Sequence, residues 1–389
     1  MGRLPYWRLS FYYFFYFAFF GAFSPYFTLY LQSISFSAWD IGLIMSQMQL
    51  MRLAGPYLWG WLSDRGYRRI AIVRLSGAVS LAGFLLFFGL ESRNALLTAM
   101  TVLAFFWSAA LPLMETLTFD HLHERAAGYS RIRLWGSVGF IVAVLGTGAL
   151  LDAAPPIGVL WVCAAMLIGI LAFALVVPEA PMRSHPAATV SIQHILRQAR
   201  VRALLAACFF MAAAHGAYYV FYSIHLTQLG YDRLEVGALW SLGVVAEILM
   251  FMAMPHLTHR YGLRALLLWT YAAATLRFAL IGWGASVPGI LLFAQLLHAL
   301  TFGTYHAATI TAINRWFPGN SQARGQALYS SLSFGAGGLL GGLLAGIGWD
   351  AVGAAWVYTL SALFALAGYG LILRWVREER SVPHCKTIA

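Results

Sequence analysis

The chain has 389 residues, of which 61% are hydrophobic and only 10% are charged, and its mean hydropathy is +0.73. Soluble domains carry about 25% charged residues, so a soluble fold could not bury this much apolar surface. The formal net charge is +11, but the basic residues fall in short clusters between apolar runs, which excludes a nucleic-acid-binding face and favours a membrane protein.

Long apolar runs follow one another along the whole sequence. A membrane-spanning helix needs about 20 mostly apolar residues, because every backbone polar group must be bonded within the segment. The first run lacks a small-residue cleavage site and is too long for a signal peptide, so we expect a retained first helix. The sequence predicts twelve spans, at residues 7–32, 37–62, 70–90, 94–120, 130–151, 156–178, 203–229, 233–256, 264–284, 288–315, 323–348 and 352–375.

Loop charges predict the orientation of these spans. Arginines cluster on one side of them, whereas only Arg93 and Arg233 fall on the other side. Because a lysine and arginine excess marks the cytoplasm, we expect both termini there, in a multi-pass protein of the bacterial inner membrane. A proline-containing cytoplasmic linker at residues 181–202 is expected to separate an N-terminal bundle (1–180) from a C-terminal bundle with its cytoplasmic tail (203–389).

A weak internal repeat supports this division. Gly216 lies 195 residues after Gly21, and the same shift places Gly42 on Gly237. Repeats of equal topology are related by an axis along the membrane normal, with the transport site between them. The predicted fold class is therefore all-α, with twelve transmembrane helices in two pseudo-symmetric bundles of six.

Two motifs resemble a known family. The sequence GWLSDRGYRR at residues 60–69 resembles the loop motif between helices 2 and 3 of the major facilitator superfamily. The sequence YSRIRLWGSVGF at residues 129–140 resembles a run in its phenylpropionate permease family. The resemblance implies a major facilitator fold, a proton-coupled importer of an aromatic acid, and a central cavity lined by helices that include the fourth, seventh and tenth.

Four ionisable residues lie at membrane depth, where charges are costly and mark functional sites by default: Arg52, Glu115, Glu247 and Arg277. The carboxylates are candidates for proton coupling, with Glu115 first because of its place in the fourth helix. The arginines are candidates for binding a substrate carboxylate. Alternatively, Glu115 only neutralises Arg52 or Arg131, and a structural pair is the favoured interpretation of Glu247 and Arg277.

Aromatic and histidine side chains complete the predicted substrate site. Within the aromatic first helix, one stripe at three- and four-residue steps can stack a planar substrate, or else pack against lipid and other helices: Tyr16, Phe20, Phe23, Phe27 and Tyr30. His215, His298 and His306 can relay a proton or bind substrate, or bond to a neighbouring helix. No third ligand accompanies the last two histidines, so no metal is expected.

Charged residues at the cytoplasmic helix ends are predicted to act in gating. Asp64, Arg65 and Arg69 can hold the halves together in one state and release them in the other. Arg131 and Arg133 are predicted as interfacial anchors or as gate partners of Asp120. The run Gly338-x-x-x-Gly342-x-x-x-Gly346 predicts close helix packing and no phosphate site, because it lies inside an apolar span.

These features predict a symporter that imports a small organic solute with protons by alternating access, with an aromatic carboxylate such as 3-phenylpropionate as the expected substrate. The alternative is proton-coupled uptake of a nucleoside or sugar, with the arginines structural. A polytopic membrane enzyme is disfavoured, because the polar residues are scattered over both halves.

We expect no cofactor, since no nucleotide-binding motif is present and the proton gradient drives transport. The expected partners are substrate, protons and the lipid bilayer, with no nucleic acid, and the expected state is a monomer.

Overall fold

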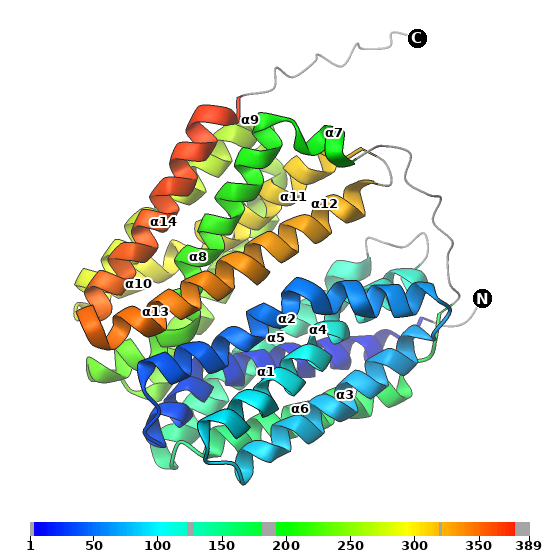
Figure 1. Cartoon of the computed structure of the whole chain (residues 1–389), viewed down its shortest axis with the longest axis vertical. Helices are drawn as coiled ribbons and strands as arrows, with labels where there is room; N and C mark the ends of the chain where they lie inside the picture. Colours follow the sequence, from blue (N-terminus) through cyan, green and yellow to red (C-terminus); the bar gives the residue numbers. More distant parts are fainter. Residues whose placement is uncertain (1–3, 123–127, 181–191, 319–320, 378–389) are drawn as a thin grey trace.

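Helices form nearly all of the computed structural model, which describes residues 4–122, 128–180, 192–318 and 321–377 apart from the side chains of Asp64 and Ala323. Within these ranges there is no strand. Figure 1 shows two groups of helices, one from the first half of the chain and one from the second. Half of the predicted linker, residues 181–191, lies outside the described residues, and the other half contains the short helix α7 (Ile192–Leu196) and the start of the next helix.

The first bundle contains six long helices. They are α1 (Tyr6–Ser33), α2 (Ala38–Asp64), α3 (Arg69–Leu85, extended by the 3₁₀ turn η1, Leu86–Phe88), α4 (Arg93–Leu122), α5 (Tyr129–Ala153) and α6 (Gly158–Val176). Inside this bundle, α1 packs on α5 and α6, and α4 packs on α2 and α3. The apolar faces between these helices bury most of the α1 rings, which places the aromatic first helix at the centre of the bundle.

The second bundle repeats this plan with more irregular helices. They are α8 (Ala199–Gln228), α9 (Arg233–Gly284), α10 (Pro288–Leu296), the π-helical η3 (Ala299–Thr304), α11 (Tyr305–Trp316), α12 (Ser321–Ser330), the π-helical η4 (Ser331–Gly337), α13 (Gly338–Val352) and α14 (Ala354–Trp375). Inside α9, Gly262 has φ 72° and ψ 163°, which folds this segment into two arms. Glycine adopts this positive φ without the steric cost that a side chain adds.

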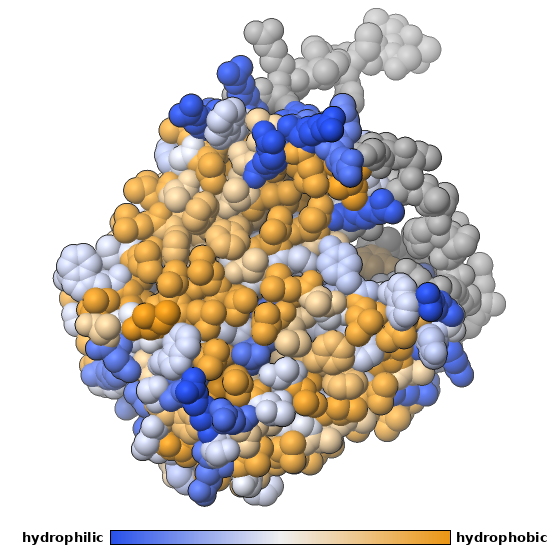
Figure 2. Space-filling model, viewed as in Figure 1, coloured by the Kyte–Doolittle hydropathy of each residue, from blue (hydrophilic) through white to orange (hydrophobic). Residues whose placement is uncertain are grey.

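The described residues thus contain twelve crossing segments, as the sequence predicts. Two crossings of the second bundle are the α10–η3–α11 segment and the α12–η4–α13 segment, and α9 supplies two more. Nine helices in the described part pass a test of length and hydropathy for membrane spans, with both arms of α9 counted as one. Figure 2 shows apolar side chains over most of the visible face, with hydrophilic residues gathered towards the helix ends. The arrangement confirms the predicted all-α fold class.

The internal repeat recurs in the helix caps. Ser37 precedes α2, and its hydroxyl oxygen accepts the backbone N–H of Asp40 at 3.2 Å. Asp232 precedes α9 and forms a capping box with Glu235. Asp232 lies 195 residues after Ser37, and Glu235 lies 195 residues after Asp40, which is the shift that relates the two halves of the sequence.

The two bundles bind each other at the ends where α2 and α9 begin. Asp152, at the end of α5, accepts the backbone N–H groups of Arg233 and Leu234 at 2.8 and 3.0 Å. Asp350, near the end of α13, accepts the backbone N–H of Ala38 at 3.2 Å. Each bundle therefore supplies one carboxylate to the first turn of a helix in the other, where the helix dipole favours negative charge. We call this side of the molecule the closed end.

The glycine run of α13 packs against α2 of the first bundle. A Cβ atom added at Gly42 would lie 2.9 Å from the Cα of Gly346, and one added at Gly342 would lie 2.7 Å from the hydroxyl oxygen of Ser46. Both positions leave no room for a side chain. The predicted close helix packing is thus found, and it joins the two bundles. Away from this seam and the closed end, the bundles diverge (Figure 1).

Candidate functional site

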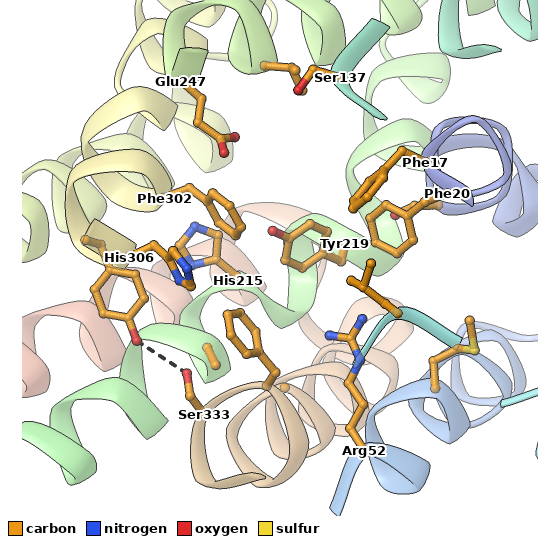
Figure 3. Close-up of a pocket in the computed structure, with 18 of the residues that line it drawn as sticks. Phe17, Phe20, Arg52, Ser137, His215, Tyr219, Glu247, Phe302, His306 and Ser333 are labelled. Carbon is orange, nitrogen blue, oxygen red and sulfur yellow. Dashed lines mark hydrogen bonds between the residues drawn. The ribbon is translucent and has the colours of Figure 1, made fainter. Parts of the chain in front are cut away.

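A cavity of about 930 Å³ lies between the two bundles. Residues of α1, α2, α4 and α5 form one wall, and residues of α8, α9, η3, α11, η4 and α13 form the other. Nine residues that the sequence singled out line it: Tyr16, Phe20, Phe23, Arg52, Glu115, Arg133, His215, Glu247 and His306. Figure 3 shows several of them pointing into a common space. The volume suits a small organic solute.

Arg52 is the cationic residue that α2 supplies to the cavity. Its guanidinium points into the space between the bundles (Figure 3) and lies 5.9 Å from the ring centroid of Phe334. Among the described residues it forms no ion pair with a carboxylate, including the predicted partner Glu115. Arg52 is half-buried, and a cation partly removed from water is stabilised by a counter-charge. Arg52 is therefore suited to bind an anionic group that enters the cavity.

Aromatic rings of α1 form one side of the cavity. Tyr16 stacks on Trp107 of α4, with centroids 4.3 Å apart and ring planes at 11°, so its orientation is fixed. Phe20 and Phe23 also line the space, one and two turns further along the helix. Tyr30 does not line the cavity; its hydroxyl donates to the backbone oxygen of Phe87 at 3.3 Å. The predicted stripe thus contributes to the cavity over its first half only.

Glu115 binds within its own bundle through a hydroxyl group. Its Oε1 accepts a hydrogen bond from the Tyr129 hydroxyl at 2.9 Å. One turn further along α5, Arg133 lines the cavity with its guanidinium 3.7 Å from the centroid of Phe17. Arg131 is exposed and faces away. The alternative interpretation, in which Glu115 only neutralises Arg52 or Arg131, is therefore wrong for the described residues: Tyr129 binds its Oε1, and the carboxylate lies at the cavity wall.

The expected pair of Glu247 and Arg277 is also wrong. Glu247 lines the cavity with its Oε2 atom 3.8 Å from Nε2 of His298. Arg277 is fully buried behind the cavity wall, where it donates to the backbone oxygen of Ala294 at 3.1 Å and to Oε1 of Gln295 at 3.2 Å. Neutral acceptors thus surround Arg277. Arg277 therefore lies inside the second bundle and does not line the cavity in which a substrate would bind.

Arg277 fixes the state of a histidine that does face the cavity. Its NH1 group lies 3.5 Å from Nε2 of His215, and Nδ1 of His215 lies 2.8 Å from the backbone oxygen of Met211. Because a guanidinium only donates and a carbonyl oxygen only accepts, Nε2 of His215 carries no proton and Nδ1 carries one. His215 is therefore neutral in this arrangement, and its ring is held at the cavity surface.

Three parallel rings follow one another along the tenth crossing segment. Phe302 lies between His298 and His306, with interplanar angles of 17° and 8°. His306 also contacts the Tyr329 hydroxyl through Nδ1 at 3.2 Å, whereas the buried Nδ1 of His298 has no hydrogen-bond partner in the described part of the chain. Phe302 and His306 line the cavity, and His298 lies behind them. In the described residues no three His, Cys, Asp or Glu side chains group as metal ligands.

The residues predicted to gate the halves bind inside the first bundle. Arg69 of α3 forms a buried ion pair with Asp120 of α4, and its Nε donates to the Ser63 hydroxyl at 3.4 Å. Arg69, and neither Arg131 nor Arg133, is therefore the partner of Asp120. Arg65 lies over the ring of Trp61, 4.0 Å from its centroid. The side chain of Asp64 lies outside the described residues.

Replacing Asp120 with asparagine is expected to destabilise the protein by about 1–3 kcal/mol, because Arg69 keeps its buried charge and loses the charged acceptor. Thermal unfolding of the purified protein in detergent measures the change. Glu179→Gln is the control: its ionic partner Arg68 is 3.8 Å away and largely exposed, and glutamine can still accept the backbone N–H of Ile70 that Glu179 binds at 3.2 Å, so we expect a smaller change. An unchanged melting temperature for Asp120→Asn would show that the Arg69 pair contributes no net stability.

Several cavity residues carry no distinctive signal in the sequence. Tyr219, Phe302 and Phe334 line the space, but they are three among many aromatic residues in apolar helices. Gln49 also lines it, three residues before Arg52, and a helical wheel drawn from Arg52 would have placed it on the same face. The sequence predicts Arg133 only as an anchor or gate residue. Its place in the cavity wall depends on the rotation of α5 about its axis, and residue spacing does not determine this rotation.

Comparisons with known proteins agree with this architecture. The MFS_1 like family matches residues 6–360. A protein of Escherichia coli (strain K12) named "Probable 3-phenylpropionic acid transporter" is 29% identical over 368 residues, covering 92% of this chain and 95% of that protein. The "Maltose permease" of Geobacillus stearothermophilus is 28% identical over 379 residues, covering 95% of this chain and 94% of that one.

A solved structure gives the same fold. The crystal structure of "nucleoside transporter NupG" superposes with a TM-score of 0.84 at 16% identity, covering 96% of this chain and 99% of that chain. This structural likeness shows the fold, and the family match over residues 6–360 shows to which family the chain belongs. The chain belongs to the MFS_1 like family, and it is a multi-pass membrane transporter with the major facilitator fold.

Proposed function

We propose that this transporter is a proton-coupled symporter that imports an aromatic carboxylate such as 3-phenylpropionate by alternating access. The observation that carries the proposal is the guanidinium of Arg52, which faces an aromatic cavity and has no carboxylate partner among the described residues. A planar guanidinium binds a carboxylate through two parallel hydrogen bonds, and the rings of Tyr16, Phe20 and Phe334 suit an aromatic body. The name of the Escherichia coli relative agrees with this substrate class.

Two carboxylates support proton coupling. Glu115 and Glu247 face the cavity from opposite bundles, and neither lies within 4.0 Å of an arginine or lysine nitrogen among the described residues. A carboxylate at such a wall can take up a proton when the site faces one side of the membrane and release it on the other. Since no cofactor is needed for this cycle, the proton gradient is the driving force that we propose.

The proposed orientation follows from the loop charges. Arg93 and Arg233 begin α4 and α9 on the side of the closed end, whereas the other loop arginines lie at the diverging end. The positive-inside rule supports a cytoplasmic diverging end with both termini on that side. We propose the bacterial inner membrane as the location. In this orientation the described state has an inward-facing cavity. We also propose that one copy of the chain suffices, because the cavity is made by its own two bundles.

Nucleoside or sugar uptake is a second candidate. The hydroxyl and imidazole groups at the cavity wall, from Tyr219, His215 and His306, suit the hydroxyl groups of a neutral solute. The relative from Geobacillus stearothermophilus bears the name of a sugar permease. A neutral solute has no charge for a guanidinium to bind. Arg52 in the cavity wall therefore favours the acid over this second candidate.

Uptake of labelled 3-phenylpropionate into proteoliposomes tests the proposal. An inward proton gradient is expected to drive accumulation of the acid, and collapse of the gradient with a protonophore should release it. A potassium diffusion potential without a pH difference separates proton coupling from a simple response to voltage. Absence of uptake under every gradient, together with accumulation of a labelled nucleoside or of maltose, would replace the acid with the second candidate.

A further inference from the structure

One face of α2 presents three polar groups to the cavity at successive levels. Ser46, Gln49 and Arg52 all line it, at three-residue steps along the helix. The hydroxyl oxygen of Ser46 and the amide oxygen of Gln49 are buried and have no hydrogen-bond partner among the described residues. Ser46 is only 1% exposed. Buried polar atoms are nearly always bonded, and these two belong to residues of the cavity wall, so a substrate group in the cavity can supply the bonds that they lack.

Two glycines of the opposite helix lie close to these two groups. Gly338 and Gly342 of α13 face them, and both glycines also line the cavity. A Cβ atom at Gly342 would lie 2.7 Å from the Ser46 hydroxyl oxygen, and one at Gly338 would lie 3.3 Å from the amide carbon of Gln49. A side chain at either position would fill the space next to the polar atoms. The seam therefore keeps a narrow polar niche beside the arginine.

A hydroxyl group satisfies this niche better than other substituents. It both donates and accepts, so it can donate to the amide oxygen of Gln49 and accept from the hydroxyl of Ser46. Residues three apart on a helix are neighbours on its surface, and one small group between them can reach both. A second carboxylate would repel the unpartnered amide oxygen, and an apolar substituent would leave both polar atoms without a bond.

The distance between the niche and Arg52 determines which position of the substrate must carry the hydroxyl group. Ser46 lies six positions before Arg52 and Gln49 lies three before it, which are about 9 Å and about 4.5 Å along the helix axis. The longer span is comparable to the distance from the carboxylate of an arylpropanoate to a hydroxyl on the far edge of its ring. A hydroxyl next to the carboxylate would remain at the level of Arg52.

We propose that Gln49 and Ser46 are specificity-determining residues that bind a ring hydroxyl group, so that the preferred substrate is a ring-hydroxylated aromatic acid held at its other end by Arg52. This inference rests on the proposed function and adds the substituent that the cavity recognises. The transporter should therefore favour 3-(4-hydroxyphenyl)propionate over 3-phenylpropionate.

Equilibrium binding of both labelled acids to the purified full-length protein tests the inference. One added hydrogen bond is expected to make the hydroxylated acid bind about 3- to 10-fold more tightly. Gln49→Met has nearly the same shape without the amide, and it should bring the ratio of the two affinities to about one. Ser46→Ala is a smaller change that should lower the same ratio, and it serves if the first variant does not fold.

Gln47→Met is the matched control, because Gln47 lies on the same helix but bonds to Thr101 of α4 and to the backbone of α2. Its ratio should equal that of the unaltered protein. Equal binding of both acids by the unaltered protein would overturn the inference and leave the proposed function standing. A preference that survives in both niche variants would also overturn it. If neither acid binds, the proposed function fails as well.

Discussion

Replacing Arg52 with glutamine is expected to weaken the binding of 3-phenylpropionate by about 10- to 100-fold, the range for losing a hydrogen-bonded charged partner. The reason is that this guanidinium faces the cavity and has no carboxylate partner among the described residues, so a substrate carboxylate would be its counter-charge. Lysine at position 52 should recover only part of the loss, since an ammonium cannot form the two parallel bonds of a guanidinium.

Two comparisons test whether Arg52 binds the carboxylate of the substrate or only supports the shape of the cavity. The neutral amide of the same acid should bind the Arg52→Gln protein about as well as it binds the unaltered one, because no charge is lost for this ligand. Arg131→Gln removes an exposed arginine of α5 outside the cavity and should leave acid binding unchanged. Equal weakening of the acid and its amide would show that Arg52 supports the shape of the cavity and does not bind the carboxylate.

Replacing Glu115 with glutamine is expected to abolish accumulation of substrate against its gradient while exchange of substrate across the membrane continues. Glutamine keeps the size of the side chain and can still accept the hydrogen bond from Tyr129, but it cannot carry a proton through the cycle. Counterflow and gradient-driven uptake in the same proteoliposomes separate the two activities. Accumulation at the level of the unaltered protein would remove Glu115 from the coupling mechanism.

Glu247→Gln identifies which carboxylate couples the proton. If Glu115 carries the proton alone, the Glu247 variant should still accumulate substrate, although its contact with His298 is changed. If both variants exchange substrate without accumulating it, the two carboxylates act together. Glu179→Gln, outside the cavity, provides the control for a carboxylate substitution that has no part in the cycle.

The sequence was sufficient for the plan of the fold, because the membrane imposes length and apolarity on every crossing segment. The observed helices begin and end within a few residues of the predicted spans. The shifts reach four residues at α8, which begins at Ala199 and not at residue 203, and at α13, which ends at Val352 and not at residue 348. The first arm of α9 continues beyond residue 256 to the bend at Gly262. The close packing of α2 and α13 could also be predicted from the sequence, because glycines at four-residue steps permit close packing wherever they face another helix.

Charge partners were harder to predict, because they depend on helix rotation. Glu247 and Arg277 lie on consecutive crossings of α9, yet Arg277 points into the bundle and Glu247 into the cavity. Likewise, Asp120 bonds to Arg69 of α3, although the basic cluster at the start of α5 is nearer in the sequence. Spacing along one helix limits which residues share a face, but it does not state which neighbour this face meets. The wall position of Arg133 escaped prediction for the same reason.

The closed end explains how the two halves could drift apart in sequence and keep a matching architecture. Asp152 and Asp350 bind backbone N–H groups, so the side chains at Arg233 and Ala38 contribute nothing to these bonds. These two positions correspond under the repeat, and they now hold a large cation and a single methyl group. Evolution could therefore alter the recipient helix freely, provided that each half retained one acid at the other edge of the contact. At these two positions the two halves match in their main-chain bonds, although their side chains differ.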